Sequence, residues 1–261
     1  MAYEVNNCSE QCRARRPRAY MSEFGTTTLH LKNPWVVTFW SFAFPGCGNL
    51  MQGRLVKGLV LICWELLVNN QSNVNLAIMY SLLGRFDMTK QVVNTRWLLL
   101  YVSLYVYAMW DSFRGTVDLN KQYLLADRED GPMRPVVIKT LDTNFLDKQM
   151  PALAACLSLL MPGLGHLYVH KVMTGLFFIS WTILVIYLSH ALQAVQYTMI
   201  GAFDMARSVV DMQWLMFLPS IYGFVLHDAY VSAVEQGKLF QKVQSRLLRE
   251  WYQHRRFKMP M

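Results

Sequence analysis

The sequence has 261 residues and a composition far from that of an average soluble protein. Hydrophobic residues make up 54 % and charged residues only 16 %, whereas a soluble domain has roughly 25 % charged residues. The net charge is +8, and three polar regions hold 18 of the 25 lysines and arginines. In a membrane protein, lysines and arginines are concentrated in the loops that stay in the cytoplasm, and this accounts for the basic excess without nucleic acid. The composition therefore argues against nucleic acid as a partner.

The chain begins with a polar, basic region at residues 1–33. The first apolar run starts only at Trp35, so no cleavable signal peptide is visible, and we expect this region to be cytoplasmic. Cys8 and Cys12 form a lone CxxxC pair. A zinc site needs two further ligands, so we expect no metal here.

Six apolar runs follow, each close to the roughly 20 residues with which a helix spans a bilayer: 35–51, 55–69, 97–110, 152–169, 172–188 and 213–226. They predict an all-α, polytopic, multi-pass protein of the cell membrane. A shift of 117 residues aligns two parts of the chain without a gap, with about 28 identities over 88 positions. The predicted domains are membrane repeat 1 (34–121), a polar linker (122–149), membrane repeat 2 (150–238) and a basic C-terminal tail (239–261), with three helical elements in each repeat.

Each repeat starts with a proline, and its first helix reaches a Pro-Gly-x-Gly turn. Proline removes a backbone donor there, and glycine lets the chain turn and lets helices approach closely. A second helix follows, with another glycine near its start. A third element begins at Asp87 or Asp204, each expected to be a helix N-cap. We assign a structural role to the residues that recur in both turns and helix starts: Pro45, Gly46, Gly48, Gly58, Pro162, Gly163, Gly165 and Gly175.

This pattern resembles the two-transmembrane-segment domain family. The second repeat matches more closely, through PGLGHLYVHK and the following Gly175-Leu176. In the first repeat Asn49 replaces the histidine and Met51 the tyrosine, so a polar role of that pair is absent or altered there. The resemblance covers about 50 residues of each repeat. Since the function of most family members is unknown, it implies architecture more than activity.

Four polar residues are candidates for function: Glu65, Asp111, Asp228 and His166. Glu65 lies inside an apolar segment, where an ionisable residue is by default a candidate for a functional site. Alternatively, its side chain reaches Arg54 or the interface between membrane and water. Asp111 and Asp228 recur in both repeats, and we expect each to bond to the basic turn of its own repeat. His166 and His170 have the spacing of a metal-binding pair, but no acidic third ligand is near, so we predict no metal and no cofactor.

The number of crossings per repeat decides the orientation of the two copies. Three crossings would invert the copies. If the Pro-Gly-x-Gly hairpin does not cross fully, the copies are parallel, and residues 1–33, the linker and the tail share one side. The distribution of lysine and arginine favours the parallel arrangement.

The sequence contains no nucleophile arrangement, phosphate loop or dinucleotide fingerprint. We therefore expect a non-enzymatic structural or partner-binding membrane component, with the lipid bilayer and a protein partner or a second copy as its contacts. The alternative is a small transporter or channel with a site between the two repeats, because internal duplication around a midplane site is common in transporters. An intramembrane enzyme is the weakest alternative.

Overall fold

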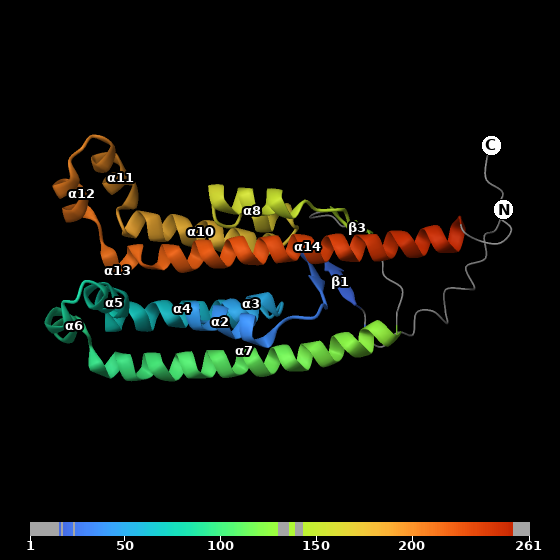
Figure 1. Ribbon diagram of the computed structural model, residues 1–261, viewed down its shortest axis with the longest axis horizontal. Coiled ribbons are helices and arrows are strands. Elements are labelled where there is room, and N and C mark those ends of the chain that lie inside the picture. The colour runs from blue at the N-terminus through green and yellow to red at the C-terminus, as the bar shows by residue number, and fades with distance from the viewer. Residues whose placement is uncertain (1–15, 17, 23, 130–135, 139–142, 253–261) are drawn as a thin grey trace.

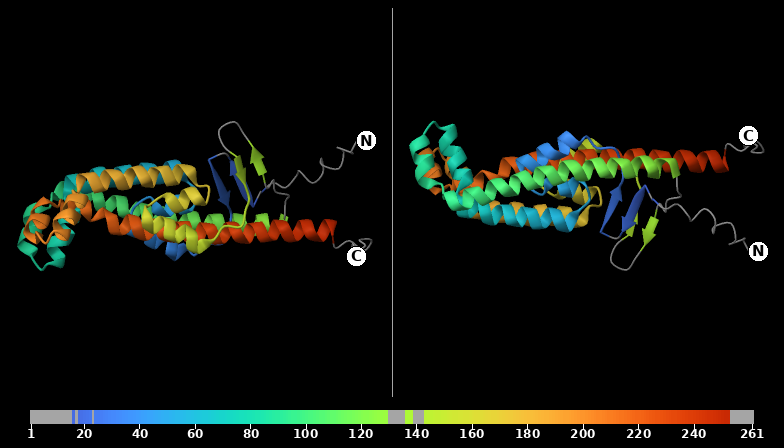
Figure 2. Two further views of the ribbon diagram at one scale, coloured as in Figure 1. Left: turned by 90° about the horizontal axis from the view of Figure 1, so that it is seen from above. Right: turned by 90° about the horizontal axis from the view of Figure 1, so that it is seen from below.

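The computed structural model describes residues 16, 18–22, 24–129, 136–138 and 143–252, and these form an elongated, mostly helical molecule (Figure 1). Small β-hairpins lie at one end, and short helices turned away from the long axis lie at the other (Figure 2). The Cys8 and Cys12 pair and the end of the basic tail lie outside the described residues.

The first repeat is built from a short helix pair, a long helix, two short helices and a very long helix. They are α2 (Pro34–Ala43), α3 (Cys47–Met51), α4 (Leu55–Ser72), α5 (Val74–Leu82), α6 (Phe86–Val92) and α7 (Thr95–Glu129). α7 continues far past Asp111, so the polar segment that follows this aspartate is helical, and part of the region assigned to the linker is helix.

The second repeat has the same order of elements. They are α8 (Pro151–Leu160), α9 (Leu164–Tyr168), α10 (Val172–Leu188), α11 (Ala191–Met199), α12 (Phe203–Val209), α13 (Met212–Leu215) and α14 (Phe217–Trp251). Most helices begin 117 residues after their counterparts; α13 and α14 together correspond to α7 and are separated at Met216. The expectation of three helical elements per repeat was wrong, because glycines and left-handed residues divide each repeat more finely.

The beginning of the third predicted element shows why it is divided. Asp87 lies in the first turn of α6, whose N-cap is Arg85, and Asp204 lies in the first turn of α12, whose N-cap is Ala202. Neither aspartate is therefore the N-cap that the sequence predicts. Each retains a favourable position in the field of the helix N-terminus. A separate helix then follows each of these short ones.

The Pro-Gly-x-Gly turns fold the chain back to the end at which each repeat starts. Lys32, just before α2, donates from Nζ to the carbonyl oxygen of Met51 at the end of α3. In the second repeat the amide of Met150, just before α8, donates to the hydroxyl of Tyr168 at the end of α9, over 3.1 Å. The two repeats also run in the same direction: α7 and α14 both extend toward the hairpin end (Figure 1). This is the parallel arrangement.

A shared apolar core joins the repeats. Helices α2 to α4 contribute Val37, Phe44, Cys47, Leu50, Ile62 and others, and α10 and α14 contribute Phe178, Trp181, Val185, Phe217, Ile221 and Phe224. Phe44 meets Phe217 edge to face, with ring centroids 6.0 Å apart, and Trp40 meets Phe224 in the same way at 5.6 Å. Such aromatic pairs add to the stabilisation that burial of their area gives.

Two antiparallel hairpins cover the end of the bundle at which the repeats start. β1 (Ala19–Ser22) pairs with β2 (Gly25–Thr28), and β3 (Val136–Ile138) pairs with β4 (Thr143–Phe145). The first hairpin is held to the second repeat by the amide of Val172, which donates to the carbonyl oxygen of Phe24 over 3.0 Å. Asn144 of β4 donates to the carbonyl oxygen of Ser22 and to the Thr26 hydroxyl. The all-α prediction did not include these strands.

Among the described residues, no helix alone has both the length and the apolar composition to cross a bilayer. Two bent pairs satisfy these criteria together: α10 with α11, bent by 60°, and α12 with the segment Met212–Arg249, which contains α13 and most of α14, bent by 82°.

Candidate functional site

The glycines of the two turns occupy equivalent, tightly packed positions. Gly46 and Gly163 have φ values of +99° and +107°, which glycine adopts readily and other residues rarely do. A Cβ on Gly163 would lie 2.5 Å from the carbonyl oxygen of Gly175, and one on Gly46 would clash with that of Gly58. Pro45 and Pro162 precede these glycines. Gly165 packs against Ser158 and Ala154, and Gly48 against Ser41 and Ser112. These contacts support a packing role for the motif.

Asp228 of α14 lies at the centre of a polar cluster formed by the second turn. Its Oδ2 atom lies 3.0 Å from Nε2 of His166 and 2.9 Å from Nζ of Lys171. Since a carboxylate only accepts hydrogen bonds, the histidine must carry a hydrogen on Nε2. The Asp228 side chain is 5 % exposed and that of His166 is fully buried. The expected contact of this aspartate with its own basic turn is confirmed, and its histidine partner is His166 instead of the adjacent His227.

The first repeat has a more open version of this cluster. Asp111 of α7 accepts a hydrogen bond from Lys57 Nζ over 2.6 Å, and an Arg54 nitrogen lies 4.0 Å from its other oxygen. The Lys57 side chain is 35 % exposed, so this ion pair faces solvent more than its counterpart does. Asn49, which replaces the histidine, is buried with no hydrogen-bond partner for its side chain among the described residues. The two repeats therefore share the aspartate and differ in the groups that surround it.

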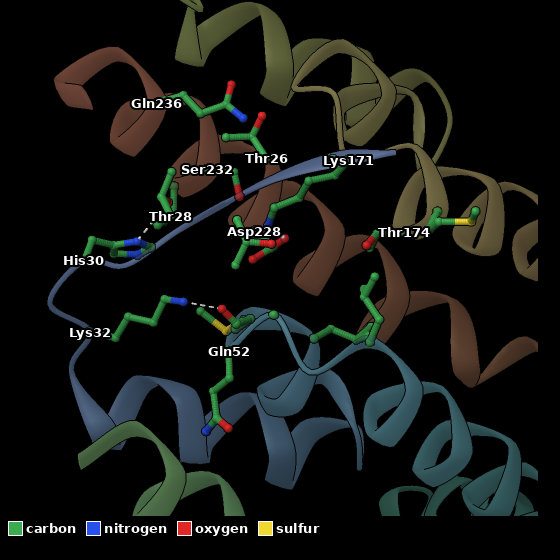
Figure 3. Close-up of a pocket in the computed structure, with 18 of the residues that line it drawn as sticks. Thr26, Thr28, His30, Lys32, Gln52, Lys171, Thr174, Asp228, Ser232 and Gln236 are labelled. Carbon is green, nitrogen blue, oxygen red and sulfur yellow. Dashed lines mark hydrogen bonds and ion pairs between the residues drawn. The ribbon is translucent and has the colours of Figure 1, made fainter. Parts of the chain in front are cut away.

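A cavity with about 70 Å³ of free volume opens beside Asp228 (Figure 3). The first hairpin and the segment after it, the α3–α4 turn, the α9–α10 turn and α14 form its walls. Figure 3 shows the side chains of His30 and Lys171 pointing inward, toward Asp228, and the ammonium group of Lys32 pointing to the carbonyl oxygen of Met51. Thr26, Thr28, Ser232 and Gln236 add polar groups to the wall. His30, Lys32 and the hydroxyl residues are not among the site residues predicted from the sequence, because they belong to the N-terminal region, which was predicted only to be basic and cytoplasmic, or to the polar end of a helix.

The electrostatics of the cavity are dominated by cationic side chains. Burial and the neighbouring charge of Lys171 lower the pKa of Lys32 to about 8. Burial, together with the charges of Lys32 and Lys171, lowers the pKa of His30 to about 3, so this imidazole is neutral at pH 7. Both causes disfavour positive charge, and they outweigh the opposite influence of Asp228 on the pKa of Lys32 and of His30.

Glu65 lies in a second polar cluster, between the repeats. It is buried, and its Oε1 atom accepts from Asn69 Nδ2 at 3.0 Å and from the Tyr101 hydroxyl at 3.3 Å. Gln213 of the second repeat donates from Nε2 to Asn69 Oδ1 over 2.8 Å, and Asn75 Nδ2 donates to the Gln213 carbonyl oxygen. The interpretation that Glu65 reaches Arg54 or the interface was wrong. Burial between α4 and α7 directs this carboxyl group into the interior.

Searches of protein-family models, of the curated proteins and of the solved structures found no match to this chain. Within the described part of the chain, no group of three or more histidine, cysteine or acidic residues has a geometry that could hold a metal ion.

Proposed function

We propose that this protein is an integral membrane protein that acts as a non-enzymatic structural or partner-binding component. The observation that carries the proposal is the distribution of polarity across the bundle. Polar side chains such as Asn69, Ser72 and Thr182 are buried, whereas the outer faces of α2, α4, α8 and α10 expose large apolar side chains. The exposed set includes Trp35, Phe39, Phe42, Val56, Val60, Leu67, Leu159, Leu160, Leu176, Ile183 and Tyr187. An apolar surface of this extent indicates contact with lipid or with another protein.

Helix dimensions support a bilayer as the contact. α7 and α14 have 35 residues each, about 50 Å at 1.5 Å per residue, which exceeds the roughly 30 Å of a hydrocarbon core; neither is apolar enough to pass the composition criterion alone, and α14 passes it together with α12 and α13. Since the chain returns to its starting end after each Pro-Gly-x-Gly turn, each repeat would cross an even number of times. Residues 1–33, the linker and the tail would then share one side, where the basic residues favour the cytoplasm.

Two exposed cysteines test lipid contact directly, because Cys63 of α4 and Cys156 of α8 lie on the apolar outer surface. The test uses a variant with Cys8→Ser, Cys12→Ser and Cys47→Ala, so that Cys63 and Cys156 are its two remaining thiols. In liposomes both thiols should react with a polar maleimide at least tenfold more slowly than they do after denaturation. The liposomes are opened by freezing and thawing, so that reagent reaches both sides.

The matched control places a thiol at the exposed Lys148 near the second hairpin, through Lys148→Cys in a chain without other cysteines. This thiol should react equally fast in liposomes and after denaturation. Equal fast reaction of Cys63 and Cys156 in liposomes would contradict membrane insertion. Release of the protein from cell membranes by an alkaline carbonate wash would contradict it independently.

The Glu65 cluster favours a small transporter as the second candidate. Its Oε2 atom is buried without a hydrogen-bond partner among the described residues, at the junction of the repeats. A buried carboxyl group there could carry a proton or a cation. Liposomes with the wild-type protein should then take up protons or potassium faster than empty liposomes, and Glu65→Gln should remove the difference. Equal uptake by empty and wild-type liposomes would exclude transport of these two ions.

A further inference from the structure

The cavity beside Asp228 contains a cation without a carboxylate partner. Lys171 is paired with Asp228 at 2.9 Å, whereas the ammonium group of Lys32 donates to the carbonyl oxygen of Met51. No described carboxylate forms an ion pair with Lys32. An ammonium group has three donors, so at least two N–H groups of Lys32 remain for another acceptor. A charge held in this way is unfavourable in the empty protein and becomes favourable when an anion enters.

Neighbouring neutral groups offer a further donor, whichever tautomer His30 adopts. The Thr28 hydroxyl lies 3.4 Å from His30 Nδ1, and His30 Nε2 is buried without a described partner. If the hydroxyl donates to Nδ1, the hydrogen of the neutral ring is on Nε2 and remains unused. If Nδ1 donates to the hydroxyl oxygen, the hydroxyl hydrogen remains unused. One donor of this pair is therefore left in the wall of the cavity, beside Lys32 (Figure 3).

We propose that this cavity binds a phosphate group, with Lys32 and Lys171 supplying the charge and the Thr28–His30 pair and Ser232 supplying neutral donors. Among the described residues that line the wall, Asp228 is the one acidic residue. Its charge is compensated by Lys171 and by the hydrogen bond from His166. Two lysines and one aspartate give the cavity a net charge of +1. A metal cation would be repelled by both lysines.

Phosphate fits this arrangement better than a carboxylate, because its oxygens can accept from donors on several walls at once. The donors come from the end of β2 and the segment after it, from the α9–α10 turn and from α14, so they lie on several walls of the cavity. The ligand is either the phosphate of a lipid headgroup or a phosphate compound in solution. The site is independent of the proposed membrane function, because binding can be measured in detergent.

The experiment uses the full-length protein in a neutral detergent and follows its thermal unfolding midpoint. One arm titrates sodium phosphate against sodium chloride of equal ionic strength. The other titrates dioctanoyl phosphatidic acid against dioctanoylglycerol, which has the same chains and no phosphate. We expect a saturable rise of the midpoint with a phosphate-bearing probe and none with its control. A rise in the first arm assigns a soluble phosphate, and a rise only in the second assigns a lipid.

Variants link the binding to this cavity. Lys32→Met should raise the half-saturating concentration at least tenfold, and Ser232→Ala should raise it several-fold. The control is Lys121→Met on α7, which removes the same charge from a side chain that is 68 % exposed and paired with Asp118; it should bind as wild type does. Circular dichroism verifies folding. The proposal is overturned if neither probe stabilises the wild-type protein, or if folded Lys32→Met or Ser232→Ala binds as tightly as wild type.

Discussion

Replacement of Lys32 by methionine should stabilise the empty protein. Lys32 has a pKa of about 8 in the fold, against an ordinary value of 10.5. At 1.36 kcal/mol per pKa unit, the fold opposes the charge of this lysine by about 3 kcal/mol at neutral pH. Methionine keeps the length of the apolar stem and removes the charge. It also removes the hydrogen bond to the Met51 carbonyl oxygen, which costs about 1 kcal/mol. We therefore expect a net stabilisation of about 2 kcal/mol.

The stabilisation should depend on pH in a defined window. Between pH 8 and 10.5 the unfolded chain binds a proton at Lys32 that the folded chain does not, so the stability of the wild-type protein rises with pH. Below about pH 8 the lysine is charged in both states, and the unfavourable contribution is fully present. The advantage of Lys32→Met should therefore be constant below about pH 8, decrease above it and disappear at about pH 10. At higher pH only the lost hydrogen bond remains, so the variant should be less stable than wild type by up to about 1 kcal/mol.

Thermal unfolding in neutral detergent, without phosphate, measures this effect. For a chain of this size, 2 kcal/mol corresponds to a rise of about 4–8 °C in the unfolding midpoint at pH 7. Lys121→Met is again the control, and its exposed side chain should give a change of less than about 1 kcal/mol at every pH. A lower midpoint for Lys32→Met at pH 7, or an advantage that persists at pH 10.5, would refute the electrostatic reasoning.

Three further changes test the packing and the polar clusters by denaturant or thermal unfolding in detergent. Gly163→Ala should lower the free energy of unfolding by more than about 3 kcal/mol or prevent folding, because its Cβ would clash with the carbonyl oxygen of Gly175. Gly201 also has a positive φ but has open space around it, so Gly201→Ala should cost only about 1 kcal/mol. Similar losses for the two variants would contradict the clash. Asp228→Asn should cost about 3–5 kcal/mol, because it removes the charge that balances Lys171 in a buried cluster. Asp111→Asn should cost less than about 1 kcal/mol, because its ion pair with Lys57 is more exposed. The reverse order would be inconsistent with the burial of the two sites. Gln213→Ala should cost about 1–3 kcal/mol, because Asn69 and the Leu76 amide lose their partner, and an unchanged stability would show that water replaces it.

Several features of the fold followed from the sequence because they depend on local chemistry. Only glycine fits a position that has positive φ and lies against another stretch of backbone. Because Gly46 and Gly163 occupy equivalent positions in the two repeats, the sequence indicated that both turns have the same geometry, and both residues do have positive φ and a close backbone neighbour. The aspartates near the ends of the apolar runs could likewise be paired with the basic turn of their own repeat. Burial in an apolar element makes a nearby counter-charge necessary.

Other features required contacts between distant segments. Glu65 has partners on the same helix and on α7, and the network continues through Asn69 to Gln213, which is 144 positions away. A hydrophobicity pattern cannot show which neighbouring helix presents a tyrosine or an amide. The functional interpretation of Glu65 was therefore open until its surroundings were known.

The sequence by itself determined a helical, internally similar protein whose Pro-Gly-x-Gly turns serve packing. Only the tertiary structure decided that each turn folds back to its starting end and that the first hairpin closes over the second turn, through the Val172 amide and the Phe24 carbonyl oxygen. This closure brings Lys32 of the basic N-terminal region beside Lys171 and Asp228 of the second repeat. Local sequence sets turn geometry and helix periodicity, but the energies that join segments more than a hundred residues apart arise only when the chain is packed.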